Sequence, residues 1–130
     1  TDEEHARNAL IGFFANLSTG NYADAAPLFG GEIEQYIRQP EPGESPEAYW
    51  ADICPFLWCL PIAEITSAEQ VSADEYLFYI VFAHPEWGRF EDGACCGADP
   101  AAHPPIWQFA YPVRKIDGVW KVMRAPLFTP

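Results

Sequence analysis

The residues of this chain best suited to covalent bonding or metal binding are four cysteines. Cys54 and Cys59 form one group, and Cys95 lies beside Cys96. An even count in a small acidic chain favours disulfides in an oxidising compartment. A regular helix would hold Cys54 and Cys59 more than about 7 Å apart, and bridging neighbours would strain a small ring. We therefore expect each bond to join one group to the other, closing a loop of about 40 residues worth up to ~4 kcal/mol.

Free thiols and a zinc site are the two alternatives for these cysteines. His84 and His103 flank the Cys95–Cys96 pair and would supply nitrogen ligands to a metal. The spacing matches none of the usual structural zinc patterns, so we expect no metal and no cofactor. A lone histidine in loop sequence is usually neither a ligand nor a base, and no serine or cysteine lies in a recognisable catalytic triad.

Arg124 is the second residue that could do chemistry. The sequence predicts a hairpin around Asp117-Gly118, because both central residues of a type I′ turn need a positive φ. This register places Arg124 opposite Tyr111 on a largely apolar face. A buried guanidinium needs an acceptor, because an unpaired buried charge is expensive. The acceptor is either an internal carboxylate or the carboxylate of a ligand.

The same register sorts the closing hairpin into two faces. It pairs Ile116 with Val119, Lys115 with Trp120, and Val113 with Val122. The apolar face then carries Phe109, Tyr111, Val113, Trp120 and Val122, and the other carries Arg114, Lys121, Pro112 and Met123. One apolar face is typical of an antiparallel pair packed on a core.

Length and charge bound the function classes. A chain of 130 residues predicts one domain, residues 1–130. The net charge of −12, from 7 basic and 19 acidic residues, repels phosphate backbones and anionic lipids, so we expect no nucleic acid partner. No apolar run approaches the ~20 residues of a membrane span. The chain starts at Thr1 without a leader, which favours a mature exported or lipid-anchored protein.

Three helices are predicted in the first half. Residues 2–18 have apolar side chains at helical spacing behind a Thr1–Glu4 capping box. A short helix follows Asn21 and is bent by Pro27. Ser45 and Pro46 begin the third, with Tyr49, Trp50 and Ile53 as its apolar stripe. The segment 32–39 fits either a short strand or one helical turn.

Two further strands are predicted at 62–71 and 75–84, joined by the turn 72–74. The later strand is apolar on both faces and must therefore be covered on both. Helices cover one face, and the other needs a loop or a second subunit. The second of these coverings predicts a homodimer through the sheet. Residues 85–105 form a long loop, which Cys95 and Cys96 are expected to pin.

This order of elements resembles the nuclear-transport-factor-2-like (NTF2-like, SnoaL-like) superfamily. The segment 20–26, GNYADAA, is similar to the link between its first two helices, and 117–122, DGVWKV, is similar to its closing hairpin. The resemblance implies an α+β fold in which three N-terminal helices pack on a strongly curved antiparallel sheet, enclosing a cone-shaped cavity. It indicates five cavity residues: Tyr36, Trp50, Tyr111, Trp120 and Arg124. Enzymes of the superfamily often have a carboxylate base after the second helix, where Glu34 and Tyr36 would substitute.

Three functions fit these observations. The first is a non-catalytic domain of an exported or surface-tethered protein that binds a small apolar or carboxylate ligand, or another protein. The second is a small-molecule isomerase, hydrolase or cyclase using the cone cavity. The third is a structural dimerisation module. An enzyme requires at least two convergent ionisable groups in an open cavity, whereas a plugged, aromatic-filled cone favours a structural or partner-binding role.

Overall fold

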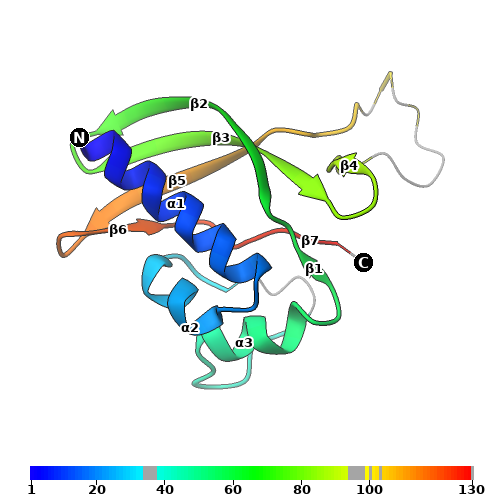
Figure 1. Cartoon of the computed structure of the whole chain (residues 1–130), viewed down its shortest axis with the longest axis horizontal. Helices are drawn as coiled ribbons and strands as arrows, with labels where there is room; N and C mark the ends of the chain where they lie inside the picture. The colour runs from blue at the N-terminus through cyan, green and yellow to red at the C-terminus, as the bar shows by residue number, and fades with distance from the viewer. Residues whose placement is uncertain (34–37, 94–98, 100, 103, 130) are drawn as a thin grey trace.

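The computed structural model describes residues 1–33, 38–93, 99, 101–102 and 104–129. Tyr36, Cys95, Cys96 and His103 lie outside these residues, as does half of the segment 32–39. Helices occupy the first part of the chain and a curled antiparallel sheet the second, so the predicted α+β fold is confirmed (Figure 1). The helical elements are α1 (Asp2–Ser18), α2 (Tyr22–Ala25), the 3₁₀ turn η1 (Ala26–Leu28) and α3 (Pro46–Ile53). The strands are β1 (Trp58–Cys59), β2 (Ile62–Ser72), β3 (Glu75–His84), β4 (Gly88–Arg89), β5 (Phe109–Ile116), β6 (Val119–Val122) and β7 (Phe128–Thr129).

Helix α1 is fixed by its first residues and by one apolar face. The Thr1 hydroxyl accepts a hydrogen bond from the Glu4 backbone N–H, and the Glu4 carboxylate accepts one from the Thr1 amino group, so the predicted capping box is present. The helix lies across the sheet and buries Phe13, Phe14 and Leu17 among its apolar residues. It ends before Gly20, whose φ of 81° is readily adopted by glycine.

The next two helices follow the predicted signals. Helix α2 passes into the 3₁₀ turn η1 at Pro27, which cannot donate the hydrogen bond that a continuing α-helix needs. The Ser45 hydroxyl caps α3 by accepting from the Ala48 N–H at 3.2 Å, and Pro46 occupies the first helical position. Helix α3 then buries Tyr49, Trp50 and Ile53, as predicted.

The main sheet has the order β2-β3-β5-β6, with β4 paired to β3, and β1 pairs separately with β7. The β5–β6 register is the predicted one: Val113 faces Val122 and Ile116 faces Val119. Positive φ angles of 51° at Asp117 and 81° at Gly118 make the tight turn. Strands β2 and β3 match the predicted pair, and His84, expected beside a loop, is the last residue of β3.

Aromatic rings fill the space between α1 and the inner face of the sheet. Phe14 contacts both Phe82 and Tyr111 edge-on, with ring centroids 5.1 and 5.2 Å apart. Phe13 stacks on Phe29 and contacts Trp50 edge-on. Such ring pairs stabilise beyond the area they bury. The core therefore occupies the region in which the cone cavity was expected.

The predicted cysteine pairing is wrong for the first group. Cys54 and Cys59 are bonded to each other, with Cα atoms 5.3 Å apart. The prediction assumed a helix continuing through both residues. Helix α3 instead ends at Ile53, residues 54–57 turn, and Cys59 lies in β1, so the chain brings the two Cα atoms within bonding distance.

Candidate binding pocket

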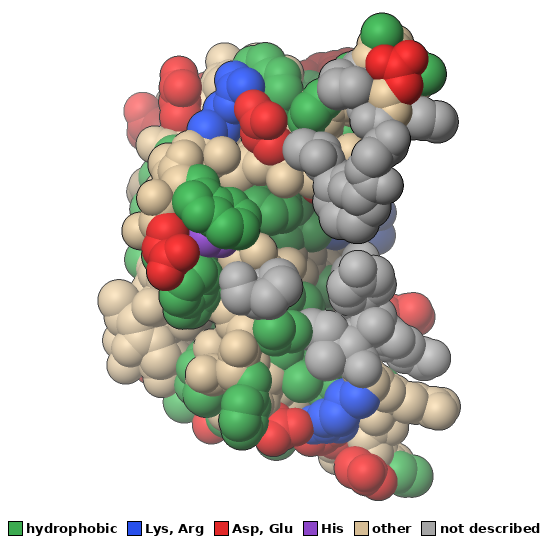
Figure 2. All heavy atoms as spheres, turned by 90° about the vertical axis from the view of Figure 1, so that its right-hand side faces the viewer, with side chains coloured by type: hydrophobic (Ala, Val, Ile, Leu, Met, Phe, Trp, Pro, Cys, Tyr) green, Lys and Arg blue, Asp and Glu red, His purple; other side chains and the backbone are tan. Residues whose placement is uncertain are grey.

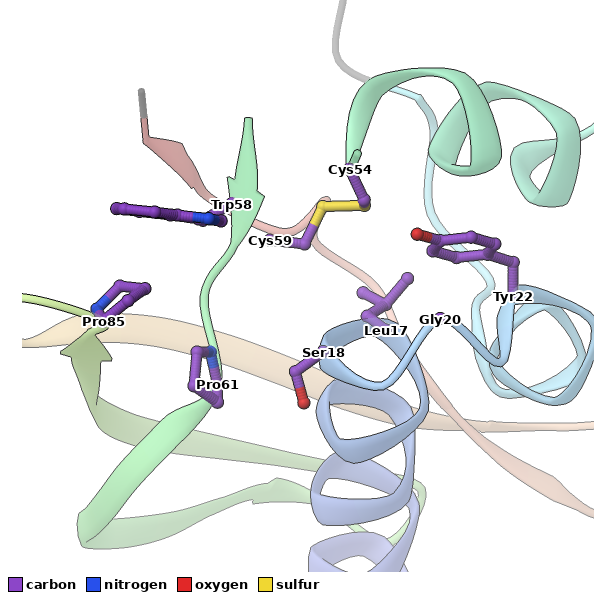
Figure 3. A pocket seen from close by; sticks show the side chains of 9 residues that line it. All are labelled: Leu17, Ser18, Gly20, Tyr22, Cys54, Trp58, Cys59, Pro61 and Pro85. Carbon is purple, nitrogen blue, oxygen red and sulfur yellow. A yellow bond between two sulfur atoms is a disulfide. The ribbon is translucent and has the colours of Figure 1, made fainter. Parts of the chain in front are cut away.

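A small pocket lies where the helices meet the short β1–β7 sheet. Its volume is about 210 Å³, below the roughly 300–1,000 Å³ typical of sites for drug-sized ligands. It is lined by Leu17, Ser18, Gly20, Tyr22, Cys54, Trp58, Cys59, Pro61 and Pro85 (Figure 3). This size admits a ring or a short side chain rather than a large ligand.

Four separate segments assemble this pocket: residues 17–22, Cys54, residues 58–61 and Pro85. The end of α1 and the link to α2 supply one side, with Leu17 and Tyr22 (Figure 3). The disulfide holds the end of α3 against β1, and β1 is held by its pairing with β7, in which Trp58 faces Thr129. Pro85 follows β3 directly and completes the opposite side, near Trp58. The disulfide is thus part of the pocket wall.

The polar groups of the lining are few and uncharged. The Ser18 hydroxyl donates to the Ala15 carbonyl at 3.2 Å. The Tyr22 hydroxyl makes no hydrogen bond with any described residue, and its side chain is partly exposed. The lining contains no carboxylate, imidazole, ammonium or guanidinium group. A ligand here would meet apolar surface and two hydroxyls, of which that of Ser18 already donates to Ala15.

Beside the pocket, the rings of two tryptophans contact a buried histidine. His84 is 3% exposed; the Trp87 ring stacks on its imidazole at 3.9 Å, and Trp58 contacts it edge-on at 5.3 Å. The His84 Nδ1 accepts backbone hydrogen bonds from Glu86 and Trp87 at 3.1 and 3.3 Å, which places the proton of a neutral ring on Nε2. Nε2 is buried without a partner among the described residues.

The surface around this stack is apolar and ringed by acids. Figure 2 shows hydrophobic side chains gathered on the face that carries β1, β4 and β7, with acidic side chains around them. Phe56, Trp58 and Trp87 are 82%, 39% and 73% exposed. Trp107 and Ile106 are exposed as well, and Arg89 lies 4.4 Å from the Trp107 ring centroid. Patches of this kind mark interaction sites more often than chance.

Of the five predicted cavity residues, the four that the structure describes, Trp50, Tyr111, Trp120 and Arg124, do not line the pocket. Tyr36 lies outside the described residues. Trp50, Tyr111 and Trp120 are buried: Trp50 contacts Phe13 and Phe29, and Trp120 lies 5.7 Å from Tyr76. The Tyr111 hydroxyl donates to the Ala125 carbonyl at 2.8 Å. Each of these three rings packs against other aromatic rings of the core.

Arg124 donates to a backbone carbonyl, and not to either of the predicted acceptors, an internal carboxylate or a ligand carboxylate. Its Nη1 donates to the Ala110 backbone carbonyl at 3.0 Å, and its guanidinium carbon lies 5.0 Å from the Tyr111 ring centroid. Strand β6 ends at Val122, which leaves the adjoining edge of β5 without a strand partner at Ala110. Arg124 therefore completes the hydrogen bonding of β5, and no described carboxylate forms an ion pair with it.

A charged cluster outside the pocket lining fastens the loop before α3. Arg38 binds both Glu44 carboxylate oxygens at 2.8 Å, and its Nε donates to Asp52 at 2.9 Å. The hydrogen bonds from Arg38, with one from the Glu41 backbone N–H, lower the pKa of Glu44 to about 2. The same bonds raise the pKa of Arg38. Every charge in this cluster is paired, which indicates a structural role.

Neither a metal centre nor a membrane helix emerges from the described residues. They contain no group of three or more His, Cys, Asp or Glu that could hold a metal ion. None of the described helices is long and apolar enough to span a membrane.

Sequence reasoning missed Tyr22, Pro61, Pro85 and Trp87 as pocket or surface residues. No local pattern could have found the pocket, because it is assembled from segments spread over residues 17–85. One signal was available at the surface: Trp87 follows a strand and a proline in a stretch with few residues to bury it. An aromatic ring so placed is a candidate for recognition.

Comparisons with known proteins bear on the fold. No family sequence model and no curated protein sequence matches the chain. Among solved structures, the chain is similar to a protein from Streptomyces avermitilis described as a "putative dehydratase from the NTF2-like family", with a TM-score of 0.51 and 14% identity. The match covers 93% of this chain and 90% of that one. At this identity the likeness concerns the fold alone, and with the helices and curled sheet it shows that the chain has the NTF2-like cone fold.

Proposed function

We propose that this chain is a non-catalytic recognition domain whose pocket between α1, α2 and β1 binds a small apolar group, presented by a free ligand or by a partner protein. The proposal rests on the lining of the pocket, which offers aromatic rings, prolines, a disulfide and a Tyr22 hydroxyl that has no hydrogen-bond partner among the described residues. The surrounding Trp58 and Trp87 widen the apolar surface available to the same ligand.

The enzymatic alternative is an isomerase, hydrolase or cyclase. Chemistry of these kinds needs a base and a proton donor placed on either side of a reacting group. Tyr22 is the one proton-transfer group in the pocket lining, and no carboxylate or imidazole accompanies it. This composition favours binding over turnover.

The disulfide supports a location outside the reducing cytosol, because such bonds persist in oxidising compartments. We therefore propose that the domain acts as an exported or surface-tethered protein.

The pocket is tested with cyclohexanone, an apolar ring with one carbonyl acceptor. We expect its titration to shift the side-chain N–H resonance of Trp58 in a ¹⁵N spectrum. Tyr22→Phe removes only the hydroxyl and should weaken binding about fivefold, the equivalent of one neutral hydrogen bond of about 1 kcal/mol. Ser18→Phe should block the pocket, since Ser18 is an exposed lining residue.

Ala15→Phe is the matched control, because Ala15 is exposed on the same helix and lies outside the lining. Equal binding by the Ser18→Phe and Ala15→Phe variants, or no shift at Trp58 in the unmodified chain, would contradict the proposed site.

A further inference from the structure

The pocket and the two tryptophans form one continuous strip, which we define as Tyr22, Trp58 and Trp87. Trp58 belongs both to the pocket lining and to the contact with His84, and Pro85 connects the lining to Trp87. Trp87 is largely exposed, yet its ring is held face to face on the buried His84 with an angle of 6° between the planes. An exposed ring that is already fixed loses little entropy on binding.

The strip offers three hydrogen-bond donors whose acceptors would have to come from a ligand. The indole N–H groups of Trp58 and Trp87 and the hydroxyl of Tyr22 have no partner among the described residues. A polyproline II segment is complementary to such a surface. It presents rigid proline rings, and its backbone carbonyls are free because this helix has no internal hydrogen bonds. Aromatic-lined grooves are a recurrent way to bind it.

Charge indicates what accompanies the prolines. Glu86 adjoins Trp87 at one end of the strip, and Asp24 lies two residues from Tyr22 at the other. Both side chains are exposed, and neither forms an ion pair within the part of the chain that the structure describes. With a net charge of −12 on the whole chain, a basic segment is attracted and an acidic one repelled.

A carbohydrate fits the strip less well. Exposed tryptophans can stack on sugar rings, but sugar hydroxyls need several polar side chains to bind them, and buried polar groups without partners are costly. The pocket supplies two hydroxyls, and that of Ser18 already donates to Ala15.

We propose that the strip of Tyr22, Trp58 and Trp87 docks a proline-rich segment of a partner protein that carries Lys or Arg beside its prolines. This inference rests on the proposed function, since it names the partner that the pocket recognises. The pocket would take one proline ring, and Trp87 would stack on a neighbouring one.

The test uses ¹⁵N-labelled full chain and three peptides: an oligoproline with arginine at both ends, the same oligoproline with glutamate at both ends, and a Gly/Ser peptide with arginine ends. We expect the first to shift the indole N–H resonances of Trp58 and Trp87 and to leave that of Trp107 in place. The glutamate peptide should bind several-fold more weakly at low salt, and high salt should reduce this difference. The Gly/Ser peptide should leave all three resonances unchanged.

Trp87→Ala should weaken the arginine–oligoproline peptide about tenfold, the loss expected of an aromatic hot spot. Trp87 is mostly exposed, so the variant should fold. Trp107→Ala is the matched control: it removes an exposed tryptophan that contacts Arg89 rather than His84, and should change the affinity less than twofold.

Three results would overturn the inference. The first is that the Gly/Ser peptide binds as well as the oligoproline. The second is that the Trp87→Ala and Trp107→Ala variants weaken binding equally. The third is that a soluble glucan oligosaccharide shifts the Trp58 and Trp87 resonances where oligoproline does not. If cyclohexanone still shifts Trp58 while oligoproline shifts nothing, the partner class is wrong and the pocket stands. If neither probe shifts Trp58, both proposals fail.

Discussion

At the scale of single residues, Glu44 makes the stability of this protein sensitive to acid. Its folded pKa of about 2 lies below the ordinary glutamate value of about 4.3. The unfolded chain therefore takes up the proton first as the pH falls. The stabilisation by Glu44 is complete above about pH 4.3 and is lost as the pH falls toward 2.

We expect the urea midpoint of the unmodified chain to fall more steeply between pH 4.5 and pH 2.5 than that of Glu44→Gln, which has no titrating group at this position. Glu41→Gln is the matched control. It changes an exposed acid of the same loop, and it keeps the backbone N–H that donates to Glu44. If Glu41→Gln flattens the pH profile as much as Glu44→Gln, the ion pair with Arg38 is not the cause.

Arg124 shows how far a residue could be predicted from the sequence. The hairpin register placed it near Tyr111 on the core side, and the guanidinium does lie over that ring. Its acceptor could not be predicted, because this depends on where β6 leaves β5 and exposes the Ala110 carbonyl. Sequence patterns locate side chains within an element, whereas unpaired backbone groups become visible only when the elements are assembled.

At the scale of elements, a close backbone approach fixes the segment after η1 beside β6. The Gly30 N–H donates to the Val122 carbonyl at 2.9 Å. A Cβ on Gly31 would lie 2.7 Å from the Met123 carbonyl carbon, which is backbone and cannot rotate away. Gly31→Ala should therefore destabilise the fold by about 1–3 kcal/mol, measured by urea unfolding.

Gly12→Ala should change the free energy of unfolding in the opposite direction in the same assay. Gly12 lies inside α1, and an added Cβ would contact Leu28 at an ordinary 3.4 Å. Alanine is favoured over glycine in a helix interior by about 0.5–1 kcal/mol, so this variant should be more stable than the unmodified chain. Equal effects of the two substitutions would show that the approach of Gly31 to β6 is not tight.

The Cys54–Cys59 bond acts at the same scale, by joining α3 to β1. With a sequence separation of 5, it should contribute about 2 kcal/mol in the chain-entropy model, less than a bond closing a longer loop. The double variant C54S/C59S should lose this amount in urea unfolding. C95S/C96S is the control: its non-reduced mass should still report one bond, in the peptide spanning residues 54–59. If the control lacks that bond, the result would support the predicted pairing between the two groups of cysteines instead.

The helices and strands were largely predictable from the sequence, whereas the disulfide and the pocket that they form were not. The capping box, the Ser45-Pro46 start and the Asp117-Gly118 turn are local signals, and the structure contains each of them. The cysteine pairing depended instead on whether α3 continues past Ile53. The pocket depended on four separate segments meeting, which no periodicity encodes.

At the scale of the whole molecule, the outer face of the sheet is divided by charge. Its centre carries Leu77, Tyr79 and Val81 of β3, which point away from the core residues Phe78 and Ile80. Glu64 and Glu69 lie on the β2 side, opposite Val81 and Leu77. Arg114 and Lys121 lie on the β5–β6 side, opposite each other. Arg114 is ion-paired with Glu75 of β3 at 2.8 Å, so Lys121 is the basic residue of this side without an ion pair among the described residues. The β2 side is thus acidic, and the β5–β6 side carries the basic charge of Lys121.

We propose that a second copy of the chain covers this face, as the apolar β3 strand predicts. A two-fold axis through the centre would lay β2 of one copy over β5 and β6 of the other, so that each acidic side meets a basic one twice. Sedimentation should then detect a dimer at micromolar concentration. Glu69→Lys should shift the equilibrium toward monomer, and so should Lys121→Glu.

Combining Glu69→Lys with Lys121→Glu should restore the dimer, because the reversed charges are complementary again. A purely structural effect of either substitution would not be rescued in this way. Lys115→Glu makes the same change of charge opposite Trp120, on the inner side of the hairpin, and should leave the dimer intact. A chain that stays monomeric throughout, or a Lys115→Glu variant that dissociates as readily as Lys121→Glu, would mean that the outer face is left to solvent and that the apolar residues of β3 are shielded by curvature of the sheet.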